Sequence, residues 1–195
     1  MSQSVTPTEW LHQLLDIMVK HQASDLLVSV GAPPSLKTPD GLVPLGQQGL
    51  NEHQVRELVM HTLPEGLCAR FQQEHEANFA LSVEGKGRFR VSAFQQRNQL
   101  AMVVRRISHE IPQIEQLGMP TMLASLAQEK RGLVLVVGGT GTGKSTTLAA
   151  MIQQRNETTG GHIISVEDPI EYLHPHKRAI INQREVGIDT ASFEV

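Results

Sequence analysis

Eight consecutive residues constrain this chain more than any other part of it. The run Gly138-Gly139-Thr140-Gly141-Thr142-Gly143-Lys144-Ser145 follows the pattern G-x-x-x-x-G-K-[ST] without deviation. An apolar run precedes it and a helix-forming run follows it, which is the strand–loop–helix context that the pattern requires. The glycines let backbone amides close around phosphate oxygens at the positive end of a helix. The segment therefore predicts a phosphate-binding P-loop rather than a glycine-rich structural turn.

The side chains of this P-loop have separate expected tasks. Lys144 can reach the β- and γ-phosphates of a nucleoside triphosphate, and the Ser145 hydroxyl can ligate Mg²⁺. ATP and Mg²⁺ are therefore the expected cofactors. The residues expected to bind the nucleotide are Gly138, Gly139, Thr140, Gly141, Thr142, Gly143, Lys144, Ser145 and Thr146.

Residues 1–107 have the pattern of a small α+β domain with a mainly antiparallel sheet. Thr6, followed by a proline and then by Glu9, predicts the capped start of a helix, and Asn51 predicts another. Alternation in the run 88–94 places Phe89, Val91 and Ala93 on the inner face of a strand. Further strands are expected at 23–30, 78–83 and 100–107, and a further helix at 64–75.

Residues 108–116 are expected to form a linker, and residues 117–195 the N-terminal part of a second domain. The pattern there changes to βαβ: helix 119–130, buried parallel strand 132–137, helix 144–155, strand 162–167 and the first turn of a helix at 188–195. A complete α/β nucleotide domain has more strands than these. We therefore expect a labile second domain, with an unpaired sheet edge, beside a well-ordered first one.

An acidic segment, Ser165–Glu171, follows the last of these strands. Its carboxylates are Glu167, Asp168 and Glu171. Ligands of doubly wound sheets bind at the carboxyl ends of the strands, so one of these groups could polarise an attacking water. An acidic surface loop ending at a proline is the alternative, and the local pattern favours neither.

Other polar candidates also have two interpretations. Arg105 and Arg131 could be arginine fingers, or solvated arginines at strand ends. The pair His174 and His176 flanks a proline, which prevents the helical spacing of metal ligands, so ordinary loop histidines are expected there.

Composition excludes several functions. The net charge is -3 and the 17 basic residues are dispersed, while aromatic residues make up 4% of the chain. These values argue against nucleic acid as a partner, since its recognition needs a basic face or a stacking platform. The N-terminus lacks the features of a signal peptide, Cys68 is the single cysteine, and no apolar run approaches the roughly 18 residues that span a bilayer. A cytoplasmic protein without membrane insertion is expected.

Several runs together resemble one family, the PilT/PilU group of type IV pilus retraction ATPases within the secretion ATPase superfamily. Some details, such as Val186–Asp189, resemble PilU more than PilT. The runs that carry the resemblance are Gly87–Phe94, Lys130–Leu135, Gly138–Met151, Gly161–Glu171 and Asn182–Val186.

This resemblance implies a PAS-like N-terminal domain, a linker and a RecA-like P-loop ATPase domain, cut here before its Walker B strand. It implies that Glu167–Glu171 is the Asp box, with Glu171 as the catalytic glutamate, and that Arg105 and Arg131 lie near the nucleotide. It also implies a homo-hexamer at the cytoplasmic face of the inner membrane. The implied partners are the platform protein of the pilus basal body and a paralogous retraction ATPase.

The function expected from the resemblance is an ATP-hydrolysing motor subunit that drives pilus retraction and twitching motility. Two alternatives stay open. The chain could be a nucleotide-binding or assembly module without turnover. It could also be a type II secretion or pilus extension ATPase, although those proteins commonly carry a tetracysteine zinc element after the Asp box and this chain has one cysteine.

Overall fold

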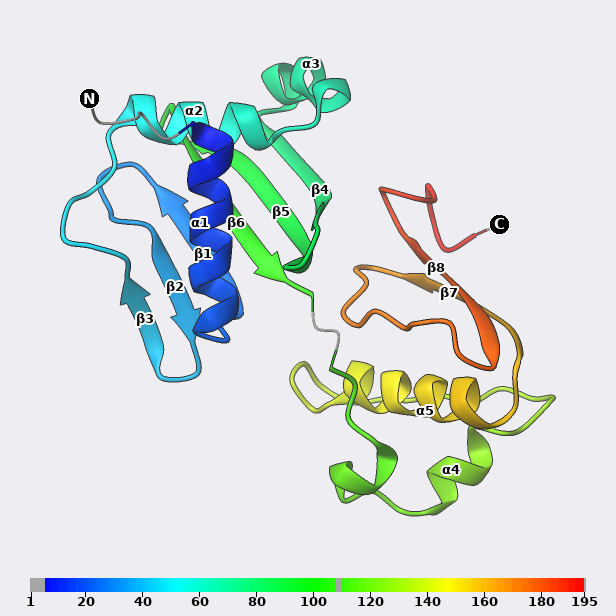
Figure 1. The fold of residues 1–195 in the computed structure, drawn as a ribbon. Coiled ribbons are helices and arrows are strands. Elements are labelled where there is room, and N and C mark those ends of the chain that lie inside the picture. Colours follow the sequence, from blue (N-terminus) through cyan, green and yellow to red (C-terminus); the bar gives the residue numbers. More distant parts are fainter. Residues whose placement is uncertain (1–5, 108–109, 195) are drawn as a thin grey trace. The chain divides into compact units, whose positions relative to one another are not determined.

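The computed structural model of the chain describes residues 6–107 and 110–194. These residues form two compact units, which divide between Arg106 and Ile107 (Figure 1). The expected linker at 108–116 is not tested as a separate element, because residues 108 and 109 lie outside the described residues. The units are considered one at a time below.

The first unit is built on an antiparallel sheet. Its strands are β1 (Asp25–Ser29), β2 (Ser35–Thr38), β3 (Gly41–Pro44), β4 (Glu76–Val83), β5 (Gly87–Gln96) and β6 (Gln99–Arg106). They lie in the order β3-β2-β1-β6-β5-β4, so β1 and β6 pair at the centre although they are far apart in the sequence. The predicted antiparallel sheet is confirmed.

Three helices accompany this sheet: α1 (Pro7–Lys20), α2 (Glu52–Thr62) and α3 (Glu65–Glu74) (Figure 1). Thr6 and Asn51 form capping boxes at α1 and α2, as predicted. In each box, the cap side chain accepts from a backbone amide three residues on, and the side chain of that residue accepts from the cap amide.

The core of the first unit lies between α1, α2 and one face of the sheet. Phe89, Val91 and Ala93 of β5 are fully buried in it, which confirms the predicted inward alternation. They pack against the apolar faces of α1 and α2, including Leu15, Met18, Leu58 and Val59.

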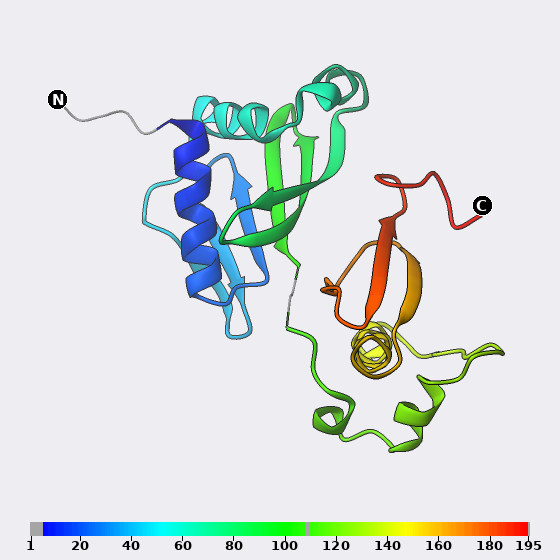
Figure 2. The same ribbon diagram turned by 45° about the vertical axis from the view of Figure 1, so that its right-hand side comes forward.

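The second unit contains the 3₁₀ helix η1 (Ile114–Leu117), α4 (Met122–Leu126), α5 (Lys144–Thr158), β7 (Gly161–Glu167) and β8 (Ala179–Glu185). Figure 2, which looks along α5, shows β7 and β8 on one side of that helix and the η1–α4 segment on the other. A small core of Ile114, Ala127, Ala150 and Met151 joins α5 to the η1–α4 side.

The sequence did not predict β8, which pairs with β7 in parallel register. Asn156 at the end of α5 is fully buried and fixes the chain where it enters this strand. Its side-chain amide donates to the Pro175 carbonyl at 2.7 Å and accepts from the Lys177 and Ala179 amides at 3.2 Å each. These contacts join distant positions, which explains why no local pattern indicated β8.

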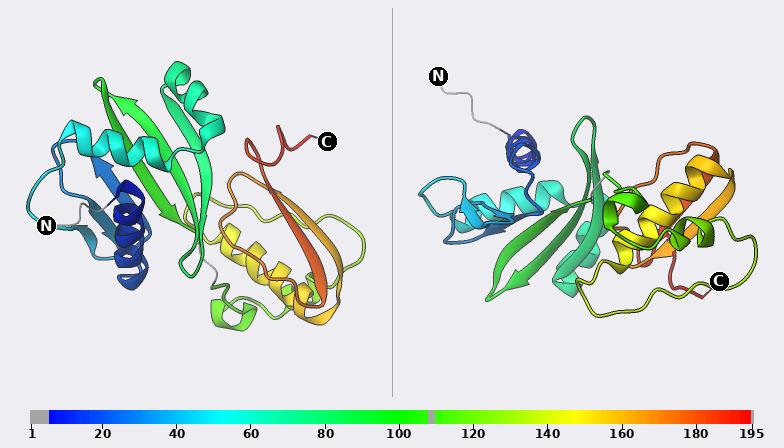
Figure 3. Two further views of the ribbon diagram at one scale, coloured as in Figure 1. Left: turned by 45° about the horizontal axis from the view of Figure 1, so that its top comes forward. Right: turned by 90° about the horizontal axis from the view of Figure 1, so that it is seen from below.

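The predicted strand at 132–137 is wrong. Residues 133–137 make no backbone hydrogen bond to any other described residue, and no arrow lies between α4 and α5 in Figure 3. Leu133, Leu135 and Val137 are 81%, 72% and 84% exposed. A β-strand is stabilised by hydrogen bonds to a neighbouring strand. Residues 132–137 have no such neighbour in the described part of the chain, because β7 pairs with β8 and not with this run.

Two further expectations differ from the structure. The helix expected at 119–130 is shorter, since α4 covers Met122–Leu126. The helical turn expected after residue 188 is wrong as far as residue 194, because the Asp189 carboxylate accepts from the Glu185 amide at 2.9 Å instead of capping a helix. The Asp189 amide also donates to the Glu185 carbonyl at 2.8 Å, which closes a turn through Gly187 at φ +82°.

Candidate nucleotide-binding site

The P-loop leads directly into α5, as the motif predicts, although residues 132–137 before it form no strand. Gly141 and Gly143 have φ of +78° and +86°, a region in which a Cβ is strained. A Cβ added at Gly138 would lie 2.7 Å from the Thr142 hydroxyl. These glycines therefore allow a loop that residues with side chains could not form.

Polar contacts within the loop orient its lysine. The Lys144 ammonium donates to the Gly139 carbonyl at 2.6 Å, and the Thr142 hydroxyl donates to the same oxygen at 2.8 Å. The Lys144 side chain thus folds back toward the loop that precedes it. Gly143 provides no side-chain cap for α5, so the first amides of that helix are suited to an anion.

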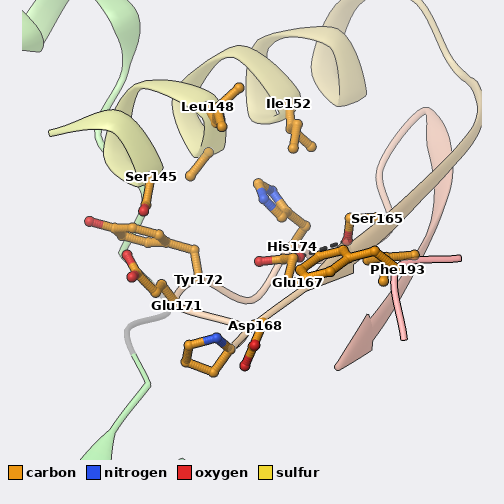
Figure 4. A pocket seen from close by; sticks show the side chains of 13 residues that line it. Ser145, Leu148, Ile152, Ser165, Glu167, Asp168, Glu171, Tyr172, His174 and Phe193 are labelled. Atoms are coloured by element: carbon orange, nitrogen blue, oxygen red, sulfur yellow. Dashed lines mark hydrogen bonds between the residues drawn. The ribbon is translucent and has the colours of Figure 1, made fainter. Parts of the chain in front are cut away.

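A hollow of about 360 Å³ lies where the acidic segment passes the start of α5. Figure 4 shows Ser145, Glu171 and Tyr172 together at one end of it, and His174, Glu167 and Phe193 farther along. The structure therefore places Ser145 and Glu171 on the wall of one hollow. The hollow is lined by Ser145, Leu148, Ala149, Ile152, Ser165, Val166, Glu167, Asp168, Pro169, Glu171, Tyr172, His174 and Phe193.

The three carboxylates of the acidic segment have different surroundings. Glu167 accepts from the Ser165 hydroxyl at 2.6 Å and from the Gln183 side chain at 3.0 Å, so it is held in place. Asp168 and Glu171 are exposed and make no hydrogen bond to the other described residues. The peptide bond between Asp168 and Pro169 is cis. Two hydrogen bonds therefore hold the Glu167 carboxylate, whereas none to a described residue holds that of Glu171.

The sequence assigned no role to two residues that shape this site, Tyr172 and Gln183. The Tyr172 hydroxyl lies 3.0 Å from the Thr146 hydroxyl on α5. Gln183 bonds to Glu167, to the Tyr172 carbonyl and to the His174 amide. Gln183 belongs to one of the runs shared with the PilT/PilU group, but its contacts follow from β8, which the sequence did not predict.

His174 is half-buried beside the hollow. Burial lowers its pKa below the usual 6.5, and the charge of Glu167 partly opposes this shift. The neutral imidazole is therefore favoured. The His176 ring accepts from the Ile181 amide at 3.1 Å. Within residues 6–107 and 110–194, no three His, Cys, Asp or Glu side chains gather as metal ligands would.

Arg105 lies on β6 in the first unit. Its guanidinium is 2.8 Å from the Asp25 carboxylate, whose side chain is 7% exposed. The Ser24 hydroxyl donates to the other oxygen of Asp25 at 2.8 Å. This arginine is thus tied into its own sheet.

Arg131 lies between α4 and α5, outside the residues that line the hollow. Its side chain is exposed and makes no hydrogen bond or ion pair within the described part of the chain. The finger roles expected for Arg105 and Arg131 remain predictions.

A sequence profile for the family described as "Type II/IV secretion system protein" matches residues 60–192. The match includes the P-loop, the acidic segment and β8, and covers most of the chain. The chain belongs to this type II/IV secretion system family. Within the family, it is 53% identical over 183 residues to the type IV pilus ATPase PilU of Pseudomonas aeruginosa. It is 39% identical over 181 residues to PilT of the same organism.

These relatives confirm the resemblance to PilT/PilU proteins. The alignments include 94% of this chain but 48% of PilU, and 93% of this chain but 53% of PilT. The chain therefore spans about half the length of the relatives it matches. Within the described residues, no helix is long and apolar enough to cross a membrane.

Solved structures with similar folds confirm the fold class. The pilus retraction motor PilT with bound ADP superposes with a TM-score of 0.86 and 38% identity, over 93% of this chain and 53% of that one. The ATPase DotB of Legionella pneumophila gives a TM-score of 0.75 at 20% identity, over 99% of this chain and 55% of that one, and supports the fold alone. An α+β domain followed by a P-loop ATPase domain is thus established.

Proposed function

We propose that the chain is part of an ATP-hydrolysing motor subunit that drives type IV pilus retraction. The observation that carries the proposal is the convergence of the P-loop serine, Ser145, and the free carboxylate Glu171 on one hollow. The relatives named PilU and PilT extend along nearly the whole chain, which favours retraction over secretion or pilus extension.

The P-loop residues fit a magnesium nucleotide. Lys144 already reaches back over the loop, where its ammonium can exchange the Gly139 carbonyl for phosphate oxygens. The Ser145 hydroxyl lies in the first turn of α5, where it can ligate Mg²⁺. When bound, Mg²⁺ neutralises charge that develops on the transferred phosphoryl group.

Glu171 is suited to act as the general base of hydrolysis. The attacking water would form a bond to the γ-phosphorus of ATP while the bond from this phosphorus to the β,γ-bridging oxygen breaks. ADP would leave with that oxygen. The water proton would pass to the Glu171 carboxylate, which is exposed and has no competing partner among the described residues. Arg105 and Arg131 would stabilise the negative charge of the transition state, as arginine fingers do.

The assembly proposed for the whole protein follows from the resemblance to retraction ATPases. It is a homo-hexameric ring at the cytoplasmic face of the inner membrane. There it would act with the platform protein of the pilus base and a paralogous retraction ATPase.

Ligand-induced stabilisation of this chain tests the nucleotide site. At free Mg-ATP 100 times the dissociation constant, binding should raise the free energy of unfolding of the second unit by roughly 2.7 kcal/mol. Lys144→Ala should lose most of this gain, because its ammonium is the charged group aimed at the phosphates. Thermal unfolding with and without Mg-ATP measures the difference.

Lys130→Ala is the matched control, since it removes one exposed positive charge from the same unit outside the P-loop. Equal stabilisation of the wild type and the Lys144 variant would overturn the assigned role of Lys144. Binding without hydrolysis by the product of the entire open reading frame would instead favour a nucleotide-binding module.

A further inference from the structure

The side chain of Gln183 makes three hydrogen bonds to the acidic segment. Its Nε2 donates to a Glu167 carboxylate oxygen at 3.0 Å and to the Tyr172 carbonyl at 2.8 Å. Its Oε1 accepts from the His174 amide at 2.9 Å. The carboxamide thereby uses both its N–H groups and its oxygen on partners from both ends of the segment 167–174.

Glu171 lies inside the part of the chain that Gln183 spans. One anchor, Glu167, precedes it by four residues, and another, Tyr172, follows it directly. Between them, Ile170 is 3% exposed, and its amide lies 3.3 Å from the carboxylate of Glu185, which also belongs to β8. One strand therefore holds the segment at both ends and in the middle.

The other side of the segment contacts α5. The Tyr172 hydroxyl lies 3.0 Å from the hydroxyl of Thr146, the residue directly after Ser145. Figure 4 shows Tyr172 next to Ser145. A chain of contacts thus runs from β8 through Gln183 and Tyr172 to the first turn of α5. Glu171 directly precedes Tyr172 in the sequence and lines the hollow together with Ser145.

We propose that Gln183 is a positioning residue that holds the segment carrying Glu171 in register with Ser145 and Thr146. The inference rests on the proposed function, because it assigns to Glu171 the proton transfer described above. Gln183 itself touches neither the nucleotide nor the water. It acts by fixing the backbone on both sides of the base.

The chemistry of the three partners explains why glutamine suits this position. A carboxylate and a carbonyl require donors, whereas an amide requires an acceptor, and a side-chain carboxamide supplies both. Asparagine has the same group on a shorter side chain. Glutamate would keep the acceptor for His174 but would lose both donors and place a second negative charge against Glu167.

Gln183→Met tests the proposal because methionine keeps the length of the side chain and removes all three bonds. Asn182→Ala is the matched control: this neighbouring residue is exposed, and its side chain contacts His162 instead of the acidic segment. Amide hydrogen exchange on the 195-residue chain should be faster by at least about tenfold at residues 168–174 in Gln183→Met. It should be unchanged in Asn182→Ala.

The second measurement is ATPase kinetics on the product of the entire open reading frame. A misplaced base slows the chemical step, so kcat should fall roughly 10- to 100-fold in Gln183→Met. KM should stay within about threefold, because the P-loop contacts are untouched. Asn182→Ala should keep both values. If Gln183→Met does not fold, Gln183→Glu should show the same pattern, since it preserves shape and loses two of the bonds.

Unchanged exchange at 168–174 would overturn the proposal, as would faster exchange with a wild-type kcat. A rise in KM at constant kcat would also overturn it, because that result assigns Gln183 to nucleotide binding. If the wild-type product hydrolyses no ATP, the proposed function fails, and the catalytic meaning of Gln183 fails with it. The exchange data would still decide separately whether Gln183 orders the segment.

Discussion

Two glutamates four residues apart differ in what surrounds them. Glu167 accepts hydrogen bonds from Ser165 and Gln183, whereas Glu171 is exposed and makes none to the described residues. A general base must reach a water with a free lone pair, which Glu171 provides. The sequence alone left an acidic surface loop as an equal alternative for this segment.

Replacing Glu171 by glutamine should separate binding from turnover. Glu171→Gln keeps the shape but removes the basic lone pair, so kcat should fall by roughly 10²–10⁴. Binding of ATP should stay near the wild-type level, because Lys144 and Ser145 are unchanged. Steady-state kinetics and nucleotide binding on the product of the entire open reading frame check this. Glu129→Gln, an exposed acid elsewhere in the unit, is the control, and an unchanged kcat would leave Glu171 a structural acid.

The two arginines call for a different comparison. If they act as fingers, Arg105→Ala and Arg131→Ala should each lower kcat on the order of 10³-fold. Arg105→Ala should also lower the melting temperature, because it leaves the buried Asp25 carboxylate without its ion-pair partner. Kinetics measured below the melting temperature of the variant separate a loss of catalysis from a loss of stability. A normal kcat in an intact assembly, matching that of the exposed Arg97→Ala control, would make either residue a solvated arginine.

Candidate site residues could be named from the sequence where a single short motif specifies them. Gly143, Lys144 and Ser145 follow from the P-loop pattern because each task depends on neighbours within eight residues. The role of Gln183 depends on partners 9 to 16 residues away in sequence, reached only once β8 lies beside β7. No local signal distinguishes it from a surface glutamine.

Helices and strands were likewise predictable where local sequence determines them, and not where distant contacts do. The starts of α1 and α2 were predictable because a capping box is complete within four residues. The strand β8 was missed because Asn156, on another element, fixes its entry. The strand expected at 132–137 was wrong because apolar, β-branched residues favour extended backbone but do not supply a partner.

The loop between β7 and β8 should make stability depend on pH. Burial lowers the pKa of His174 in the folded state below 6.5. At pH values between the lowered pKa of folded His174 and the usual 6.5 of the unfolded chain, the unfolded chain holds a proton that the folded chain lacks. The free energy of unfolding should therefore fall as pH decreases through the region just below 6.5. Above pH 6.5, His174 should contribute no pH dependence to stability.

Urea unfolding at several pH values, followed by Tyr172 emission, measures this effect. His174→Gln should flatten the pH dependence in that window, since glutamine does not titrate there. His53→Gln, at an exposed position on α2, should leave it unchanged. An identical pH profile for His174→Gln and the wild type would contradict the prediction.

At the scale of the whole molecule, the two units differ in their cores. The first unit buries a large apolar cluster between helices and sheet, whereas the second has a cluster of four buried residues. Hydrophobic burial is the main favourable term in folding, so the second unit should unfold at the lower denaturant concentration. Trp10 and Tyr172 are the single tryptophan and the single tyrosine, one in each unit, and their emission reports the transitions separately.

Hydrogen exchange gives an independent measurement. Amides of residues 133–137 should be among the fastest to exchange in the described part of the second unit, since they have no backbone partner there, and those of β5 and β6 should exchange slowest. Coincident unfolding of the two emission signals, together with equal protection of both units, would contradict the prediction.

The exposed run 133–137 also bears on how the chain behaves at high concentration. Its five residues, Leu-Val-Leu-Val-Val, include no charge and no proline, and their amides and carbonyls are unpaired within the described residues. Segments of this composition template intermolecular β-structure and aggregation. Solubility should therefore be limited by this one run, and a lysine at Leu135, its central position, is the single change best placed to interrupt such stacking.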